Sequence, residues 1–405
     1  MTTFQTMGLP ESLMHTLQSM NFQTPTPIQQ QTIPLALSGQ DILGSAQTGT
    51  GKTAAFGIPL IAKLLKEPQS SALILTPTRE LADQVLKQLR IMLGQKTKIQ
   101  TALLIGGDPM PKQLQQLKRN PQLVVGTPGR VNDHLNRRSL SLKTTNFLVL
   151  DETDRMLDMG FSIQIDEILK HMKSERQTLL FSATLAKKIS QIAEKYLKNP
   201  ERISVSSTTA PATNIKQENI NVHEADKYTK LCDELDKRTG SIIIFVKTKH
   251  NADKMAIKLS KQGHDADAIH GDLRQNKRER VLTNFRNKKY RILVATDVAA
   301  RGLDVPHIEH VINYDLPQSP EDYVHRIGRT ARAGATGEAL NLISGADKAK
   351  WYAIEHFINP GSKPPKILKM DRNTKKAPRK SFSKDDKKPF LKKKSGKPFA
   401  RKKSA

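Results

Sequence analysis

Residues 42–53 read Ile-Leu-Gly-Ser-Ala-Gln-Thr-Gly-Thr-Gly-Lys-Thr, a short apolar run that leads into a glycine-rich turn. The turn fits the phosphate-binding pattern G-x-x-x-x-G-K-[ST], with Ala46 in place of the first glycine. In such a turn backbone N–H groups surround the phosphates, Lys52 reaches the β- and γ-phosphates, and the Thr53 hydroxyl ligates Mg²⁺. A flexible Gly/Thr turn is the other interpretation. The predicted nucleotide site comprises Ala46, Gln47, Thr48, Gly49, Thr50, Gly51, Lys52 and Thr53.

Further short apolar runs recur along the chain after this turn. Each has the length of a strand, and continuous apolar runs are typical of parallel strands covered on both faces. Helix-like polar stretches, such as 79–93 and 251–261, lie between them, so the sequence predicts an α/β fold with parallel sheets. The runs are 72–75, 123–125, 147–150, 179–181, 242–246, 292–295 and 310–312.

Acidic residues follow the run 147–150 directly. In open α/β sheets the ligand lies at the carboxyl ends of the strands. Asp151 is placed to be a second Mg²⁺ anchor, and Glu152 to polarise an attacking water. Taken alone, a stretch such as 151–154 is more often a solvated acidic turn than a catalytic site. Together with the glycine-rich turn it predicts the catalytic carboxylates.

Residues 199–216 are rich in Ser, Thr and Pro and separate two sets of apolar runs, so they are interpreted as an interdomain linker. We predict a nucleotide-binding domain at 1–205, a linker at 206–216, a second domain at 217–362 and a tail at 363–405. The second domain lacks the phosphate-binding pattern but carries arginines at three-residue spacing in 325–334. These arginines could reach the γ-phosphate across a cleft, although alone they are as consistent with a basic surface.

Charge distribution adds a second prediction. The 405 residues include 66 Lys+Arg and 39 Asp+Glu, a net charge of +27 that favours a polyanionic partner, nucleic acid before anionic membrane. The tail holds 18 of the basic residues and three Asp, so it is expected to be disordered. Its spaced phenylalanines could stack on bases, or the tail could only aid solubility. No secretory signal and no apolar run of about 20 residues is evident, so a cytoplasmic location without membrane association is expected.

These motifs, in this order over residues 4–345, resemble the DEAD-box RNA helicases of superfamily 2. The resemblance implies two tandem RecA-like domains, with ATP and Mg²⁺ as cofactors. Thr153 replaces the family's alanine in the tetrad 151–154. Ala331 stands where glycine is common, so a left-handed backbone is not expected there. The run 154–161 and the basic tail resemble the bacterial RhlE subgroup.

The resemblance also assigns roles to individual residues. Gln29 would read the adenine edge beside Phe22 and Thr26, and Asp304 would contact the ribose. The implied catalytic residues are Lys52, Asp151, Glu152, Arg329 and Arg332. The residues that would couple the nucleotide site to RNA are Asp154, Ser182, Thr184, His325 and Arg326. The implied RNA path, which contacts phosphate and 2′-OH groups rather than bases, comprises Pro77, Thr78, Arg79, Gly106, Gly107, Thr127, Arg130, Arg278 and Thr296.

The expected function is therefore ATP-dependent unwinding of short RNA duplexes, or remodelling of RNA–protein complexes, by a monomer. Its expected partners are single-stranded RNA and short duplexes, with ribosomal precursors or the RNA-degradation machinery as further candidates. Two alternatives stay open at this point. One is an RNA chaperone or assembly factor that uses the tail, with ATP as a clamp signal. The other is a DNA helicase of the same superfamily.

Overall fold

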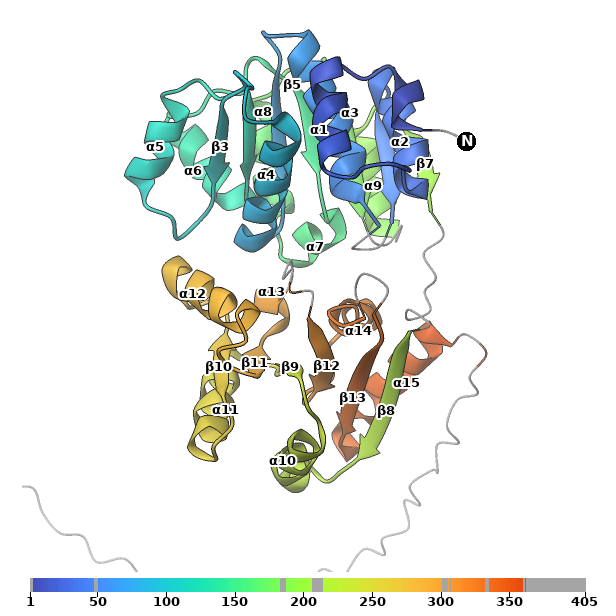
Figure 1. The fold of residues 1–405 in the computed structure, drawn as a ribbon, viewed down its shortest axis with the longest axis vertical. Coiled ribbons are helices and arrows are strands. Elements are labelled where there is room, and N and C mark those ends of the chain that lie inside the picture. Colours follow the sequence, from blue (N-terminus) through green and yellow to red (C-terminus); the bar gives the residue numbers. More distant parts are fainter. Residues whose placement is uncertain are drawn as a thin grey trace, which may run out of the picture. The chain divides into compact units, whose positions relative to one another are not determined.

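The structure, a computed structural model, describes residues 3–46, 50–182, 187–205, 214–300, 305, 307–331, 335–359 and 361. Within these residues the chain forms two parallel sheets (Figure 1). The first has seven strands in the order β3-β4-β2-β5-β6-β1-β7, and the second has six in the order β10-β11-β9-β12-β13-β8. The α/β prediction with parallel sheets is confirmed.

The first sheet and its helices use residues up to Ser204. Its strands are β1 Ile42–Ser45, β2 Ser71–Leu75, β3 Thr101–Leu104, β4 Leu123–Gly126, β5 Thr145–Leu150, β6 Gln177–Ser182 and β7 Glu201–Ser204. Its helices are η1 Phe4–Met7, α1 Glu11–Ser19, α2 Pro27–Leu37, α3 Lys52–Lys66, α4 Arg79–Leu93, α5 Met110–Leu117, α6 Pro128–Asn136, α7 Thr153–Asp158, α8 Ser162–Lys170 and α9 Lys187–Tyr196.

The second sheet begins at Ile215. Its strands are β8 Ile215–Asn221, β9 Ser241–Phe245, β10 Ala266–Ile269, β11 Ile292–Ala295, β12 Ile308–Asn313 and β13 Gly337–Ile343. Its helices are η2 Glu224–Asp226, α10 Lys227–Lys237, α11 Lys249–Lys261, α12 Gln275–Arg286, α13 Asp297–Ala300, α14 Pro320–Ile327, η4 Gly345–Asp347 and α15 Lys348–Ile358.

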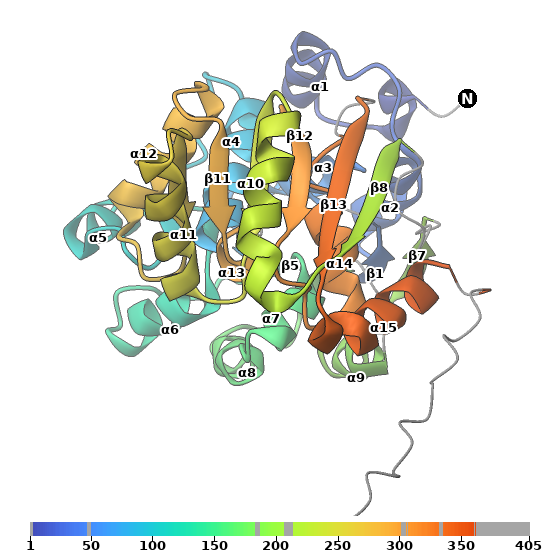
Figure 2. The same cartoon turned by 90° about the horizontal axis from the view of Figure 1, so that it is seen from below.

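Each central strand is apolar on both faces because helices cover both. In β2, Ala72 and Ile74 belong to the core formed with α1, α3 and α4, whereas Leu73 and Leu75 belong to the core under α6, α8 and α9. The second sheet follows the same rule, with α10 and α11 on one face (Figure 2). No helix among the described residues is long and apolar enough to span a bilayer.

The Ser/Thr/Pro-rich stretch 199–216 overlaps a strand at each end, whereas the narrower predicted linker 206–216 overlaps a strand only at 215–216. Glu201–Ser204 forms β7 and pairs with β1, and Ile215 begins β8, which pairs with β13. In β7 only Ile203 is buried, so this edge strand presents no apolar run that composition could reveal. Residues 206–213 and the predicted tail 363–405 lie outside the described residues.

An amide ladder crosses three neighbouring strands of the second sheet and runs from the buried Asn313 and Asn341 to the exposed Asn219. Asn313 on β12 donates to the Asn341 side chain on β13 at 2.8 Å, and Asn341 donates to Asn219 on β8 at 2.8 Å. Tyr323 on α14 accepts a further bond from Asn341 at 3.0 Å. Because these three asparagines occupy paired register positions, their amides satisfy one another inside the sheet.

Asp41 lies just before β1 and ties neighbouring segments together. Its buried carboxylate accepts from the Thr178 N–H through Oδ1 and from the Lys198 N–H through Oδ2, each at 2.7 Å. Its carbonyl accepts from the Glu201 N–H at 2.9 Å. Burial raises the pKa of this carboxyl, and the two backbone donors oppose the rise. Asp41 therefore fixes the start of β1 against β6 and β7.

We expect Asp41→Ala to lower the free energy of unfolding by about 2–4 kcal/mol, because two backbone N–H groups lose their acceptor inside the fold. Asp41→Asn keeps one acceptor oxygen and should lose less, which makes it the matched control. Urea denaturation followed by circular dichroism measures both. If Asp41→Ala were as stable as the wild type, the carboxylate would not anchor these strands.

Candidate active site

The glycine-rich turn is held from two sides at the point where α3 begins. Lys52, the first residue of α3, is buried and donates through Nζ to the Ala46 carbonyl at 2.8 Å. The Ala46 N–H in turn donates to the Ser182 carbonyl at 3.2 Å, which ties the turn to the end of β6. The predicted residues Gln47, Thr48 and Gly49 lie outside the described residues.

Gln29 on α2 connects the N-terminal motif to this turn. Its Oε1 accepts from the Thr26 N–H at 2.9 Å, and its Nε2 donates to the Gly51 carbonyl at 3.1 Å. Gly51 has φ +94°, and a Cβ there would lie 2.4 Å from Gln29 Nε2, so only glycine fits. The oxygen and the nitrogen of the Gln29 side-chain amide are thus both bonded to the chain. The contact of Gln29 with adenine stays a prediction.

Phe22 is the predicted neighbour of the adenine. Its ring packs against the ring of Phe4, a residue to which the sequence analysis gave no role. Its ring centroid lies 5.8 Å from that of Phe4, at a tilted angle of 56°. Phe4 is itself buried in the core formed with α1 and α3. A phenylalanine in an otherwise polar N-terminus was the available signal.

Asp151 and Glu152 lie buried at the carboxyl end of β5. Burial raises the pKa of Asp151 to about 6, although the charge of Lys52 opposes the rise. Glu152 has φ +52°, a left-handed backbone that is strained for a residue with a side chain. Such strain concentrates at functional sites, where the surrounding structure maintains it.

Thr153 and Ala331 are the two residues that depart from the pattern of the DEAD-box family, and the structure shows the surroundings of each. The Thr153 hydroxyl is buried and donates to the Leu150 carbonyl at 3.1 Å, so the polar atom that replaces an alanine methyl has a partner. Ala331 has φ +56°, so the expectation of an ordinary backbone there is wrong. Its left-handed conformation is imposed by tertiary contacts that its residue type does not reveal.

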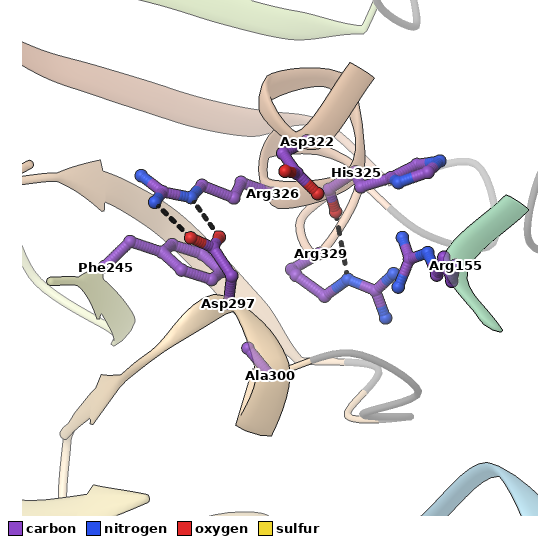
Figure 3. Close-up of a pocket in the computed structure, with 8 residues that line it drawn as sticks. All are labelled: Arg155, Phe245, Asp297, Ala300, Asp322, His325, Arg326 and Arg329. Atoms are coloured by element: carbon purple, nitrogen blue, oxygen red, sulfur yellow. Dashed lines mark hydrogen bonds and ion pairs between the residues drawn. The ribbon is translucent and has the colours of Figure 1, made fainter. Parts of the chain in front are cut away.

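Arg326 on α14 makes several contacts with side chains at the ends of strands in the second sheet (Figure 3). Its Nε and Nη2 donate to the two carboxylate oxygens of Asp297 at 2.5 and 2.7 Å, and Nη1 donates to Asn313 at 2.9 Å. Its guanidinium lies 4.7 Å from the centroid of the Phe245 ring. These contacts tie α14 to the ends of β9, β11 and β12, which matches a supporting role.

Arg326 and Arg329 line one small pocket. Arg329 donates through Nε to the His325 carbonyl at 3.1 Å. Arg155, from α7, enters this pocket beside Arg329 (Figure 3). Arg155 is 2% exposed, and its Nε lies 3.5 Å from Glu152 Oε2. Its two Nη atoms have no hydrogen-bond partner within the described part of the chain. Sequence reasoning missed Arg155, although its place directly after the tetrad was a signal.

Three other predicted residues, Thr184, Asp304 and Arg332, lie outside the described residues. The structure therefore places Asp151 close enough to Lys52 for their charges to interact, and Arg155 beside Arg329. Asp154 lies in the first turn of α7, where its Oδ1 accepts from the Arg155 N–H at 3.0 Å.

Most of the predicted RNA path converges on one cavity of about 390 Å³. Its walls come from the segments that follow β2, β3, β4 and α7, with Gly271 after β10 and Arg278 on α12. The predicted residues that line it are Pro77, Thr78, Arg79, Gly106, Thr127, Arg130 and Arg278. Gly107 and Thr296 are not part of its lining. Gly107 instead supports Arg79, since its φ is +85° and a Cβ there would lie 2.5 Å from Arg79 Nη1.

Three guanidinium groups and two carboxylates, those of Glu80 and Asp133, line the cavity, so its net charge is positive. Burial lowers the pKa of Arg79, and the charges of Arg278 and Arg130 lower it further. Arg278 Nε pairs with Glu80 Oε1 at 2.6 Å, with side chains 6% and 8% exposed, and Arg278 Nη1 donates to the His270 carbonyl at 2.8 Å. Glu80, to which the sequence assigned no role, therefore neutralises one of the three cations.

Comparison with known proteins places this geometry in a family. The DEAD/DEAH box helicase model matches residues 26–192, and the Helicase conserved C-terminal domain model matches residues 226–334. The DEAD-box ATP-dependent RNA helicase CshA of Bacillus subtilis is 47% identical over 355 residues, which are 87% of this chain and 72% of that protein. The ATP-dependent RNA helicase CshA of Listeria monocytogenes is 48% identical over 366 residues, which are 90% of this chain and 70% of that protein.

Solved structures match across both sheets. S. cerevisiae Dbp5 bound to RNA and ADP BeF3 has a TM-score of 0.80 at 35% identity, over 88% of this chain and 93% of that one. Mss116p bound to ssRNA and AMP-PNP has a TM-score of 0.78 at 30% identity, over 87% of this chain and 76% of that one. The two sheets are therefore two tandem RecA-like domains. The relatives named here are CshA proteins, so they do not confirm the RhlE subgroup. The chain belongs to the DEAD-box family of ATP-dependent RNA helicases.

Proposed function

We propose that the protein couples RNA-stimulated ATP hydrolysis to local unwinding of short RNA duplexes or to remodelling of RNA–protein complexes. One observation carries the proposal: the predicted RNA-binding and ATP-hydrolysing residues follow neighbouring strands. The Asp151 N–H donates to the Leu75 carbonyl at 3.0 Å, and the Thr76 N–H donates to the Gly126 carbonyl at 3.0 Å. The segments after β4, β2 and β5 therefore leave the sheet side by side, and adjacent strands are only about 4.8 Å apart.

We propose Mg²⁺ as the metal cofactor, held by Thr53 and Asp151. A hydroxyl and a carboxylate are oxygen ligands of the kind that Mg²⁺ prefers, and Mg²⁺ keeps several waters and binds substrate phosphates besides one or two protein groups. No cluster of three or more His, Cys, Asp or Glu exists among the described residues, which suits this sparse ligand set. Bound with ATP, Mg²⁺ would neutralise charge that develops on the phosphates.

The chain's own residues would then divide the work. Lys52 would leave the Ala46 carbonyl for the phosphates, and Glu152 would orient the attacking water. Arg329 and Arg332 would stabilise charge on the γ-phosphoryl group from the second domain. Gln29 and Asp304 would bind the adenosine. The residues that would couple nucleotide binding to RNA binding are Asp154, Ser182, Thr184 and His325.

The cationic cavity would bind the RNA backbone. Phosphates would meet Arg79 and Arg130, and most contacts would go to the backbone rather than to bases, so binding would be largely independent of base sequence. We also propose that 363–405 acts as a cationic arm that keeps RNA nearby.

The finer assignments are proposals as well. They comprise the domain bounds 1–205 and 217–362, a monomer, a cytoplasmic location and the RhlE subgroup, whose support is the run 154–161 together with the basic tail. Ribosomal precursors and the RNA-degradation machinery are the proposed cellular partners.

We expect Glu152→Gln to lower the RNA-stimulated kcat for ATP by about 10²–10⁴-fold, because the amide keeps the shape of the side chain but cannot act as a base. Nucleotide affinity should stay close to that of the wild type. Steady-state phosphate release and fluorescent-nucleotide titration measure the two quantities. Full activity of this variant, or equal stimulation by DNA, would contradict the proposal, and strand annealing without ATP would favour the chaperone alternative.

The raised pKa of Asp151 predicts a pH dependence. Below pH 6 the buried carboxyl takes up a proton and loses the charge that attracts Mg²⁺, so affinity for Mg²⁺-nucleotide should fall up to about tenfold per pH unit between pH 6 and 5. Without nucleotide, the free energy of unfolding depends on pH in the opposite direction to nucleotide affinity. The folded state holds this proton more tightly than the unfolded state, so the contribution of Asp151 to stability is lost as the pH rises through 6.

Nucleotide titrations from pH 5 to 8 test this dependence, with Asp151→Asn as the control. The amide should bind Mg²⁺-nucleotide more weakly and with a flat pH profile. A wild-type affinity that does not change over this range would contradict the assignment.

We expect Arg130→Ala to weaken RNA binding and to reduce the slope of log affinity against log salt by about 0.7, the value for one lost phosphate contact on a single strand. Arg119→Ala is the matched control, since Arg119 is an exposed arginine just after α5 that does not line the cavity. Fluorescence anisotropy at several salt concentrations measures both slopes. Equal changes in the two variants would show that the cavity is not the RNA site.

A further inference from the structure

The left-handed residue Ala331 directly follows the segment that carries Arg329 and Thr330. A backbone φ of +56° is unfavourable for alanine, because Cβ approaches the carbonyl oxygen. The conformation therefore needs support from outside the segment. It also sets the direction in which the chain leaves Arg329, two residues earlier.

Asn214 supplies this support from 117 residues away in the sequence. Its Nδ2 donates to the Ala331 carbonyl at 3.2 Å and also to the Ala335 carbonyl. Its own carbonyl accepts from the Gly337 N–H at 3.0 Å. One side-chain amide thus bridges the carbonyls on both sides of residues 332–334.

The turn is also held against the sheet below it. The Thr330 hydroxyl donates to the carbonyls of Ile308 and Glu309 at 2.6 and 2.9 Å. A Cβ on Gly337 would lie 2.2 Å from Thr330 Oγ1, so the turn packs directly on the start of β13. Ala331 packs beside the core of α14 and α15. Of these supports, only the Asn214 side chain bonds to the carbonyl of the strained residue itself.

We propose that Asn214 is a positioning residue for the arginine segment, because its amide holds Ala331 in the left-handed conformation and so aims Arg329. The inference rests on the proposed role of Arg329 at the γ-phosphate. Asn214 is also the residue that precedes β8, the strand with which the chain enters the second sheet. The end of the interdomain connection and the arginine segment are therefore joined by one side chain.

The chemistry of asparagine makes the inference specific. The Nδ2 group carries two N–H donors, which is the number needed for two carbonyl acceptors. Aspartate has the same shape but only acceptor oxygens when ionised, and alanine has neither. Asn214→Asp and Asn214→Ala therefore remove the same two bonds by different routes, and either can be used if the other does not fold.

The test measures RNA-stimulated ATPase kinetics of the full chain. We expect both Asn214 variants to lose about tenfold in kcat while KM for ATP changes by less than about twofold, since Arg329 would act on the transition state. We expect Ala331→Gly to restore kcat in the Asn214→Ala background, because glycine adopts φ near +56° without support. A general loss of structure would not be repaired by removing a methyl group at a distant residue.

Asn219→Ala is the matched control, since it removes an amide from β8 that bonds to Asn341 instead of the arginine segment. Ala331→Gly should restore nothing there. Unchanged kcat in both Asn214 variants, or a loss that Ala331→Gly does not repair, would overturn the inference. Absence of RNA-stimulated ATPase in the wild type would instead overturn the proposed function, so the two failures are distinguishable.

Discussion

The parallel register of β4, β2 and β5 is the constraint on which the site depends. Leu75 pairs with Leu150 on one side and with Gly126 on the other, so the chain leaves all three strands at the same edge. Parallel strands all end at one edge, and their carboxyl ends therefore gather polar residues that lie far apart in the sequence. The acidic residues after β5 and the threonine-arginine segment after β2 become neighbours for this reason alone.

The site also concentrates features that a fold built only for stability would avoid. Asp151 is a buried carboxyl with a raised pKa, Glu152 has a left-handed backbone, and Arg155 buries two Nη groups that have no acceptor among the residues that the structure describes. Each of these costs stability, and the apolar cores on both faces of the sheet offset the cost. Their clustering within five residues agrees with a site shaped by chemistry rather than by packing.

Sequence patterns located the central strands and missed every edge strand. The apolar runs of β2, β4, β5, β6, β9 and β11 were visible because helices bury both of their faces. The edge strands β7, β8 and β10 are exposed in part and carry no continuous apolar run, whereas β3 belongs to the apolar run 102–105, which was not among the predicted strands. The inner strand β13 was missed for another reason, since the buried Asn341 interrupts its apolar pattern and is satisfied by asparagines on the two neighbouring strands and by Tyr323 on α14.

The sequence by itself determined the fold class, the glycine-rich turn, the catalytic carboxylates and the arginine segment, because each depends on residues close together along the chain. Only the tertiary structure decided that Glu80 neutralises Arg278, that Arg155 lies beside Arg329, and that Asn214 bonds to Ala331. The partners of each pair are separated by more than 100 residues. Local pattern cannot specify such pairs, since their distance is set by how the sheets and helices pack. The left-handed Ala331 shows this most clearly, because its residue type argues for one backbone and its distant partner maintains the other.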